Sequence, residues 1–243
     1  MDHQARNSDN FNLRAFCSDV LIYSFGQAIL LIFGFVQSLI IPKYLSTTDF
    51  GYWQLFLLYT SYVGILHLGF LNGILIKWAG RNLEDFKEEV PLAFKFTLTE
   101  QGIIIGILVL IVWMIDLPSK EMALMVLANA LIVNLLMFFV ITAQATKRFK
   151  LITVANISKG LLFLIFILAV FFSGYHGYFP LILATIAAGL IILLLFAFHL
   201  RDNLFYHSGH RISLFQYGKD SIRIGIFVLL GNFIAILFTT IDR

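Results

Sequence analysis

Two residues with ionisable side chains lie deep inside apolar stretches of the sequence. Glu100 stands in the segment Leu92–Ile115 and Lys159 in the segment Leu151–Phe172, each about eight residues from its start. If both segments are helices that begin at the same membrane surface, these residues lie about 12 Å deep at about 1.5 Å per residue. A charge at the bilayer centre costs about 2.5–3.5 kcal/mol and usually faces a protein interior or a wet cavity. We therefore expect Glu100 and Lys159 either to form an ion pair that fixes helix packing or to line a transport pathway.

Other polar residues share helical faces with Lys159 or lie on neighbouring apolar segments. Three such faces follow from helical spacing: Thr153, Asn156, Lys159 and Gly160; Ser24, Gln27, Gly34 and Ser38; and Thr60, Gly64 and His67. Small and polar residues at this spacing either permit close helix packing or line a polar interior. We interpret Gln27, His67 and Asn156 as candidate cavity residues, and for His67 we favour a hydrogen-bonded packing role over that of a proton carrier. Lys95 is only about 6 Å deep by helix rise, so its ammonium group can instead reach the interface.

The sequence lacks the residue patterns that mark catalytic or cofactor sites. We find no His, Asp and Glu cluster at metal-ligand spacing, no nucleophile elbow and no glycine-rich loop that would cradle a phosphate. The single cysteine, Cys17, excludes an intrachain disulfide and a cysteine-based metal site. We therefore predict a protein that is not an enzyme and that uses no cofactor and no metal.

The composition indicates that lipid surrounds most of the chain. Of the 243 residues 60% are hydrophobic and only 13% are charged, whereas soluble domains carry about 25% charged residues. The net charge of +3 does not indicate nucleic-acid binding, because in a membrane protein the placement of the charges matters more than their sum. We predict an all-α polytopic membrane protein, because seven segments are long and apolar enough to span a bilayer. These segments are Val20–Ile41, Tyr52–Ile76, Leu92–Ile115, Met122–Ala143, Leu151–Phe172, Tyr178–Leu200 and Ile222–Ile241.

Lysine and arginine are concentrated in alternate connections, and this pattern predicts the orientation. One side holds Arg6, Arg14, Lys77, Arg81, Lys87, Lys147, Arg148, Lys150, Arg201, Arg211, Lys219 and Arg223. The other side holds only Lys43, Lys120 and Arg243. Because cytoplasmic connections are enriched in lysine and arginine, we predict a cytoplasmic N-terminus and a location in the cell inner membrane.

The order of the segments suggests four parts. Residues 1–19 would form a cytoplasmic N-terminus, 20–200 a six-helix membrane lobe, 201–220 a cytoplasmic linker and 221–243 one further helix. Within the linker, Leu204–Tyr217 mixes aromatic, basic and aliphatic residues in the manner of a short interfacial helix. The last helix ends where the sequence ends, so we expect it to lack a partner and interpret the chain as a fragment of a longer protein.

Motifs between Ser24 and Arg81 resemble the start of the polysaccharide flippases of the MOP superfamily, the group that also contains the MATE multidrug exporters. The motifs are Pro42-Lys43-Tyr44-Leu45, Asp49-Phe50-Gly51-Tyr52, Leu68-Gly69-Phe70 and the basic stretch Lys77–Arg81. Asn232 with Asp242 and Arg243 is also similar to this family. The resemblance implies a MATE-like transporter with two six-helix lobes, of which this chain would be the N-terminal lobe and the first helix of the second.

The resemblance also implies a function, the flipping of a polyprenyl-diphosphate-linked oligosaccharide by alternating access during surface polysaccharide and lipopolysaccharide biosynthesis. Its partners would be this lipid-linked oligosaccharide, membrane lipids and glycan polymerase or chain-length proteins, without nucleic acid. By the same implication, the anionic headgroup would contact Lys77, Lys95, Arg148 and Lys159, since a lysine ammonium suits phosphate as a point charge. Glu100 would balance Lys159 or couple transport to ions. Two alternatives stay open, a MATE-like drug or cation antiporter and a membrane-embedded glycan polymerase or acyltransferase.

Overall fold

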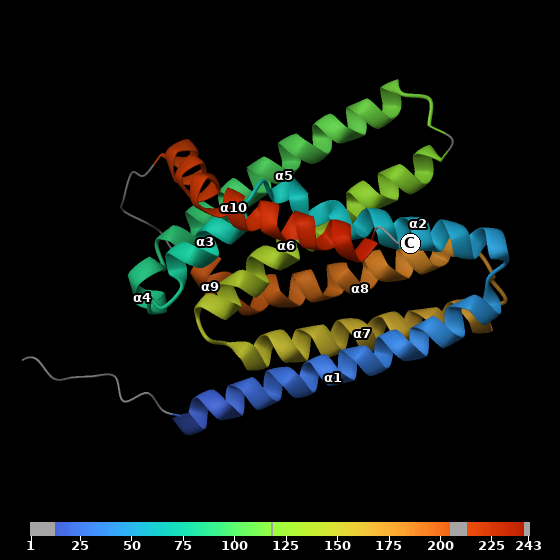
Figure 1. The fold of residues 1–243 in the computed structure, drawn as a ribbon, viewed down its shortest axis with the longest axis horizontal. Coiled ribbons are helices and arrows are strands. Elements are labelled where there is room, and N and C mark those ends of the chain that lie inside the picture. Colours follow the sequence, from blue (N-terminus) through green and yellow to red (C-terminus); the bar gives the residue numbers. More distant parts are fainter. Residues whose placement is uncertain (1–12, 118, 205–212, 241–243) are drawn as a thin grey trace, which may run out of the picture.

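The computed structural model describes residues 13–117, 119–204 and 213–240, and all regular elements within these ranges are helices (Figure 1). They are α1 (Leu13–Tyr44), α2 (Thr47–Tyr62), the 3-10 helix η1 (Val63–His67), α3 (Phe70–Trp78), α4 (Leu83–Phe86), α5 (Glu89–Met114), α6 (Lys120–Ala145), α7 (Phe149–Phe172), α8 (Tyr178–His199), α9 (Arg201–Leu204) and α10 (Leu214–Thr240). The all-α class predicted from the sequence is thereby confirmed.

Six described helices are long and apolar enough to cross a membrane, and the bent pair of α2–η1 and α3 counts as a seventh span if it is taken as one. Large hydrophobic side chains cover the outside of the bundle. Phe25, Phe35 and Trp113, for example, are 69%, 65% and 68% exposed. Water would disfavour so much apolar surface, by about 25 cal/mol for each Å², whereas lipid solvates it.

The second predicted segment, Tyr52–Ile76, is broken instead of continuous. The chain leaves η1 through Leu68 and Gly69, which have left-handed φ angles of 47° and 87°, and the two helical parts are bent by 60°. Left-handed residues end the ladder of helical hydrogen bonds. The segment was predicted from hydropathy as one span, and hydropathy does not report a bend.

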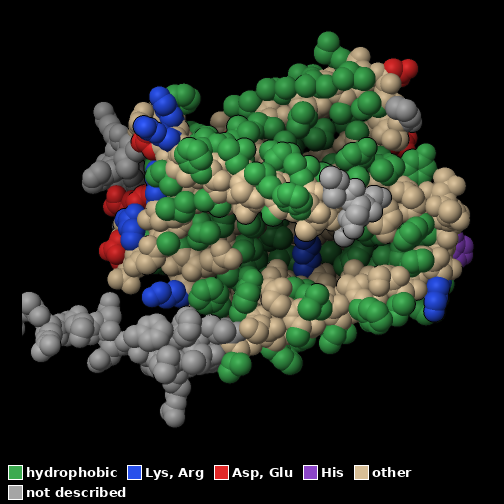
Figure 2. Space-filling model, viewed as in Figure 1, with side chains coloured by type: hydrophobic (Ala, Val, Ile, Leu, Met, Phe, Trp, Pro, Cys, Tyr) green, Lys and Arg blue, Asp and Glu red, His purple; other side chains and the backbone are tan. Residues whose placement is uncertain are grey.

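The long helices run between two ends of the bundle (Figure 1). α1 lies beside α7 at one edge, α7 packs on α8, α8 on α6 and α6 on α5. We call the end that contains α4, the last turns of α3 and α8 and the first turns of α5 and α10 the basic end. Charged side chains gather at this end, and hydrophobic side chains cover most of the surface between the two ends (Figure 2).

α10 packs closely against the bend and α3. A Cβ atom added to Gly73 would lie 1.9 Å from the Ser221 carbonyl oxygen, and one added to Gly225 would lie 2.0 Å from the Gly69 carbonyl oxygen. Each helix thus presents two small residues four positions apart, which lets the two backbones touch. The expectation that the last helix lacks a partner was therefore wrong, because hydropathy does not show that the facing surfaces are lined by small residues.

α10 also begins earlier than predicted, at Leu214. Residues 214–220 are therefore its first turns and not part of a linker, and Tyr217 is buried within them. The interfacial helix predicted over Leu204–Tyr217 is wrong for its last residues, and 205–212 lies outside the described residues. Residues 1–12 and 241–243, including Asp242 of the flippase-like pattern, also lie outside them. The division into two lobes stays a prediction.

Gly225→Ala is expected to destabilise the bundle, whereas Gly231→Ala on the same helix is not. The methyl group at position 225 would collide with the backbone of Gly69 and Gly73, and such overpacking costs about 1–3 kcal/mol. Position 231 has open space around it, so alanine there should gain up to about 1 kcal/mol of helix propensity. SDS-induced unfolding of the purified variants in mixed micelles, followed by circular dichroism, measures both effects. Equal unfolding free energies for the two variants would contradict the close contact.

Candidate functional site in the membrane interior

The bend between α2 and α3 is held by two side-chain amides from other helices. Gln101 of α5 donates from Nε2 to the Leu66 carbonyl oxygen at 3.0 Å, and Asn134 of α6 donates from Nδ2 to the Val63 carbonyl oxygen at 3.2 Å. Asn134 Nδ2 also lies 2.9 Å from Gln101 Oε1, which joins the two amides. Both side chains are buried. Because lipid offers no hydrogen bonds, carbonyls freed by a bend need such internal donors.

His67 belongs to the same bend and fixes its turn. Its Nδ1 accepts a hydrogen bond from the backbone N–H of Gly69 at 3.1 Å, and the side chain is buried. This contact agrees with the hydrogen-bonded packing role favoured for His67. His67 is not among the residues that line the cavity between α1, α7 and α8, which contains Lys159.

That cavity has a volume of about 290 Å³ and lies between α1, α7 and α8. Its polar lining consists of Gln37, Asn156, Lys159 and Thr185, and among all its lining residues Lys159 alone carries a charge. α7 has 24 residues, and Lys159 is about 15 Å from its start at about 1.5 Å per residue. The deep lysine predicted from the sequence thus lies near the middle of its span, beside Asn156 and next to a polar space.

α1, at the edge of the bundle, forms one wall of this cavity. Gly160 allows α1 to approach α7, since a Cβ atom there would lie 2.6 Å from the Phe33 ring. The other side of α1 exposes Leu31 and Phe35, which are 75% and 65% accessible. Figure 2 shows a hollow in the middle of the drawn face, with a basic side chain between hydrophobic ones. A polar space next to one peripheral helix can receive a headgroup whose tail stays in lipid.

The predicted ion pair between Glu100 and Lys159 is not present. α5 packs on α6, η1, α9 and α10, whereas α7 packs on α1, α8 and α6, so α6 lies between the helices that carry the two residues. Glu100 is only 8% exposed, and neither of its carboxylate oxygens has a hydrogen-bond partner in the described part of the chain. Within the same residues no ion pair involves Lys159. Equal depth in two helices does not make them neighbours.

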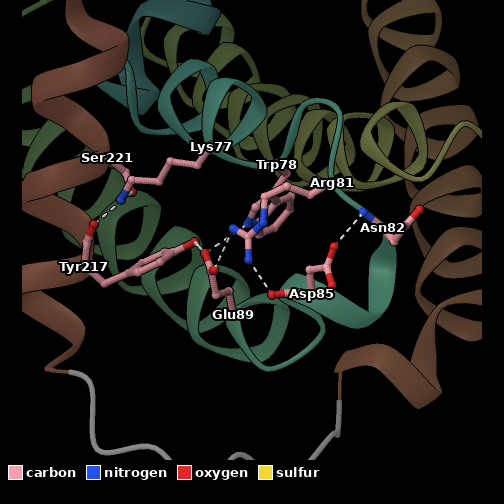
Figure 3. Close-up of polar contacts among 8 residues, drawn as sticks. All are labelled: Lys77, Trp78, Arg81, Asn82, Asp85, Glu89, Tyr217 and Ser221. Carbon is pink, nitrogen blue, oxygen red and sulfur yellow. Dashed lines mark hydrogen bonds and ion pairs between the residues drawn. The ribbon is translucent and has the colours of Figure 1, made fainter. Parts of the chain in front are cut away.

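Lys77 lies at the basic end, in a polar cluster that joins α3 to α10 (Figure 3). Its Nζ donates to Ser221 Oγ at 2.8 Å and lies 4.6 Å from the centre of the Tyr217 ring. These contacts continue the small-residue packing of the two helices toward the basic end. Lys77 therefore stabilises the contact between α3 and α10, and its ammonium group is bonded to Ser221 instead of being free for a headgroup.

Glu89 is the acceptor at the centre of the same cluster (Figure 3). Its Oε2 accepts from Trp78 Nε1 at 3.1 Å and from the Tyr217 hydroxyl at 3.0 Å, and its Oε1 pairs with Arg81 at 3.0 Å. One carboxylate thus connects α3, the start of α5 and the start of α10. Lys77, which was predicted to meet a headgroup, and Arg81 therefore hold the helices of the basic end together.

The remaining predicted residues are dispersed. Lys95 is exposed on α5, Arg148 is half-buried at the start of α7, and Gln27 is half-buried on α1 away from the cavity. Of the eight candidates, the cavity brings together only Lys159 and Asn156. Sequence reasoning missed Gln37, although Leu30, Phe33, Gly34 and Gln37 line the cavity at the i, i+3, i+4, i+7 spacing of one helical face.

Six apolar helices, a bent seventh span and buried polar groups between them define the class: the chain is an α-helical multi-pass membrane protein. Comparison of the chain with protein-family models, with curated proteins and with solved structures found no match. The class therefore rests on composition and structure, and the similarity to flippases stays a prediction.

Asn134→Ala and Gln101→Ala are each expected to lower the unfolding free energy by about 1–3 kcal/mol, because a buried carbonyl loses its donor. The two amides bond to each other, so their effects should differ from additivity by about 0.5–3 kcal/mol. SDS unfolding of the single and double variants measures this coupling. Thr185→Ala is the control, since the Thr185 hydroxyl bonds only within its own helix, and its effect should be smaller. Strictly additive losses would show that the amides do not act together.

Glu89→Ala is expected to loosen the first turns of α10, because Trp78, Arg81 and Tyr217 lose their shared acceptor. Hydrogen exchange measured by mass spectrometry should become faster in the peptide that covers 214–222. Glu84→Ala removes a carboxylate of the same end whose described ion pair is with Lys87 in the adjoining turn, and it should leave that peptide unchanged. Identical exchange in the two variants would argue against a role of Glu89 in holding α10 to α3 and α5.

Proposed function

We propose that this chain is part of a membrane transporter that moves a polyprenyl-diphosphate-linked oligosaccharide across the bilayer, and that it acts without catalysis. The observation that supports the proposal most is Lys159, a cation near the middle of its span beside a cavity of about 290 Å³. A lysine kept at this depth is unfavourable unless it meets an anion or water. A diphosphate headgroup is an anion that a lysine ammonium binds well.

The surroundings of Lys159 suit such a substrate. Asn156, Gln37 and Thr185 offer hydrogen bonds to sugar hydroxyls or phosphate oxygens. The volume is at the lower limit of ligand pockets, about 300–1,000 Å³, so the cavity takes a headgroup and not a whole oligosaccharide. Translocation of the sugar therefore requires a wider form than the one described. The polyprenyl tail would stay in lipid outside α1.

The charge distribution supports the direction of loading. The positive-inside rule supports a cytoplasmic basic end with the N-terminus on the same side, and we propose the inner membrane as the location. Arg148 and Lys95 would attract a phosphate at that surface, and Lys77 would do so only after leaving Ser221. Glycan polymerase and chain-length proteins are partners in keeping with this role.

The alternatives fit the cavity less well. A MATE-like antiporter for cationic drugs would need an acidic cavity, whereas the charged residue lining this one is a lysine. A membrane-embedded polymerase or acyltransferase would need catalytic groups at a membrane surface. The connection 173–177, at the end opposite the basic end, is short, and such a loop offers little room for them.

Lys159→Ala is expected to weaken binding of a polyprenyl diphosphate to the protein in lipid nanodiscs by at least about tenfold, equal to about 1.4 kcal/mol. Lys159→Arg should retain most of the affinity because it keeps the charge. Binding is measured with a fluorescent polyprenyl diphosphate and competed with the uncharged polyprenol, which should compete poorly. Lys43→Ala is the matched control, since it removes an exposed lysine in the last turn of α1, outside the cavity and at the end opposite the basic end.

Two results would count against the proposal. Unchanged diphosphate binding in a folded Lys159→Ala variant would remove the headgroup site. Tight binding of a quaternary ammonium dye that does not depend on Lys159 would favour the antiporter instead.

A further inference from the structure

Glu100 presents a second chemical feature that the Lys159 cavity does not use. The side chain is 8% exposed, and both carboxylate oxygens lack a hydrogen-bond partner in the described part of the chain. An ionised carboxylate in such surroundings has neither water nor a donor to stabilise it. A carboxylic acid that carries its proton is neutral and avoids this penalty. The burial and the missing donors therefore favour a proton on Glu100 in the form described.

Basic groups that could stabilise an ionised Glu100 are absent at its depth in the described elements packed against α5. The titratable and charged residues of those elements are His67 of η1, Tyr217, Lys219, Asp220 and Arg223 of α10, Lys120 and Glu121 of α6, and Arg201 of α9, in which the side chain of Asp202 lies outside the described residues. α3 also contacts α5, through Phe70 and Trp78, and contributes Lys77. Lys219, Asp220 and Arg223 are exposed on the side of α10 that turns away from the buried Ser221 and Gly225. The others, apart from His67, lie at the ends of the bundle.

His67 is the one titratable side chain of that set within the bend itself, and its position leaves it neutral. Its Nδ1 accepts from the Gly69 backbone N–H, so Nδ1 carries no proton of its own and the imidazole is not a cation. It does not form a hydrogen bond with Glu100, whose oxygens are unpartnered. An ion pair between Glu100 and a positively charged His67 therefore does not take the place of the proton on Glu100.

The position of Glu100 connects it to the bend in the neighbouring helix. Gln101 follows it directly in α5 and donates to the Leu66 carbonyl oxygen, and Asn134 donates to the Val63 carbonyl oxygen. These two amides are engaged with the bend. If Glu100 lost its proton to water, the carboxylate would need a donor. The second N–H of Gln101 Nε2 could supply it, and turning the Gln101 amide toward Glu100 would strain its bond to the Leu66 carbonyl.

We propose that Glu100 is a proton-binding site, protonated while the α2–α3 bend has the form described, and that release of this proton to water loosens the bend. The site takes a proton and not a metal ion, because the one other buried oxygen without a partner on α5 or α6 is Asn134 Oδ1, and a hard cation requires about six oxygen ligands. The inference does not depend on the proposed function, since it involves no substrate.

Two separate measurements report the protonation of the Glu100 carboxyl and the geometry of the α2–α3 bend. Infrared difference spectra between wild type and Glu100→Gln, in nanodiscs at a series of pH values, report whether the carboxyl carries a proton. Spin labels at Tyr52→Cys on α2 and Ile76→Cys on α3, in a Cys17→Ser background, report the bend. Both positions are partly exposed, at 36% and 48%. Glu84→Gln, at an exposed carboxyl, is the control.

We expect a protonated-carboxyl band at pH 7 that is lost in Glu100→Gln and retained in Glu84→Gln. An exposed glutamic acid would be ionised at that pH. We also expect the label distance to shift at the higher pH where the band disappears, in wild type but not in Glu100→Gln. Glu100→Asp, which keeps a titratable group, should retain a band and a shift even if Glu100→Gln folds poorly.

Three outcomes would overturn the inference. An ionised Glu100 at pH 7 would refute the proton site. A band that titrates while the label distance stays constant would refute the link to the bend. A band whose loss depends on Na⁺ instead of choline at constant pH would replace the proton by a metal cation. The Lys159→Ala variant should give the wild-type spectra, so failure of the headgroup proposal would not change this result.

Discussion

Backbone carbonyls at the α2–α3 bend must receive hydrogen bonds from other helices, and the positions of α3 and α10 follow from how this is achieved. In hydrocarbon a carbonyl without a donor is strongly unfavourable, and the bend exposes those of Val63 and Leu66. Asn134 and Gln101 supply the donors from two different helices. The bend then directs α3 so that Gly73 meets α10 at Ser221. Without the two amides, neither the direction of α3 nor its contact with α10 would be fixed.

The contact with α10 in turn organises the basic end. Because α3 and α10 touch through small residues, Lys77 reaches Ser221 and the Tyr217 ring. The same approach brings Tyr217 to Glu89, where Trp78 and Arg81 also converge (Figure 3). Basic residues at this end therefore have two roles. Lys77 and Arg81 form hydrogen bonds and an ion pair inside the protein. Others, such as Lys95, are exposed.

Much of the fold could be predicted from the sequence, because long apolar segments leave few choices in a bilayer. The helical class and the depth of Lys159 followed from composition and helix rise alone. The bend did not, since Leu68 and Gly69 lie in a mostly apolar segment and the amides that bond to its carbonyls lie 35 and 71 positions away in the chain. The pairing of Glu100 with Lys159 was wrong for a related reason. Depth follows from position in a helix, but neighbourhood follows from packing faces, which small residues such as Gly160 and Gly225 determine.

Two ionisable groups deep in the bundle, neither with an ion-pair partner among the described residues, thus lie in separate places. Lys159 lines the cavity beside α1, and Glu100 lies beside the bend. We propose that Lys159 receives an anionic headgroup. Solid-state NMR with lysine labelled by ¹⁵N at Nζ tests it most directly, through ³¹P dephasing of the Lys159 signal by bound polyprenyl diphosphate in nanodiscs. The signal is assigned by its loss in Lys159→Arg. We predict strong dephasing of this signal, which places phosphorus in contact with Nζ. Dephasing confined to lysines at the membrane surface, with none at Lys159, would contradict the claim.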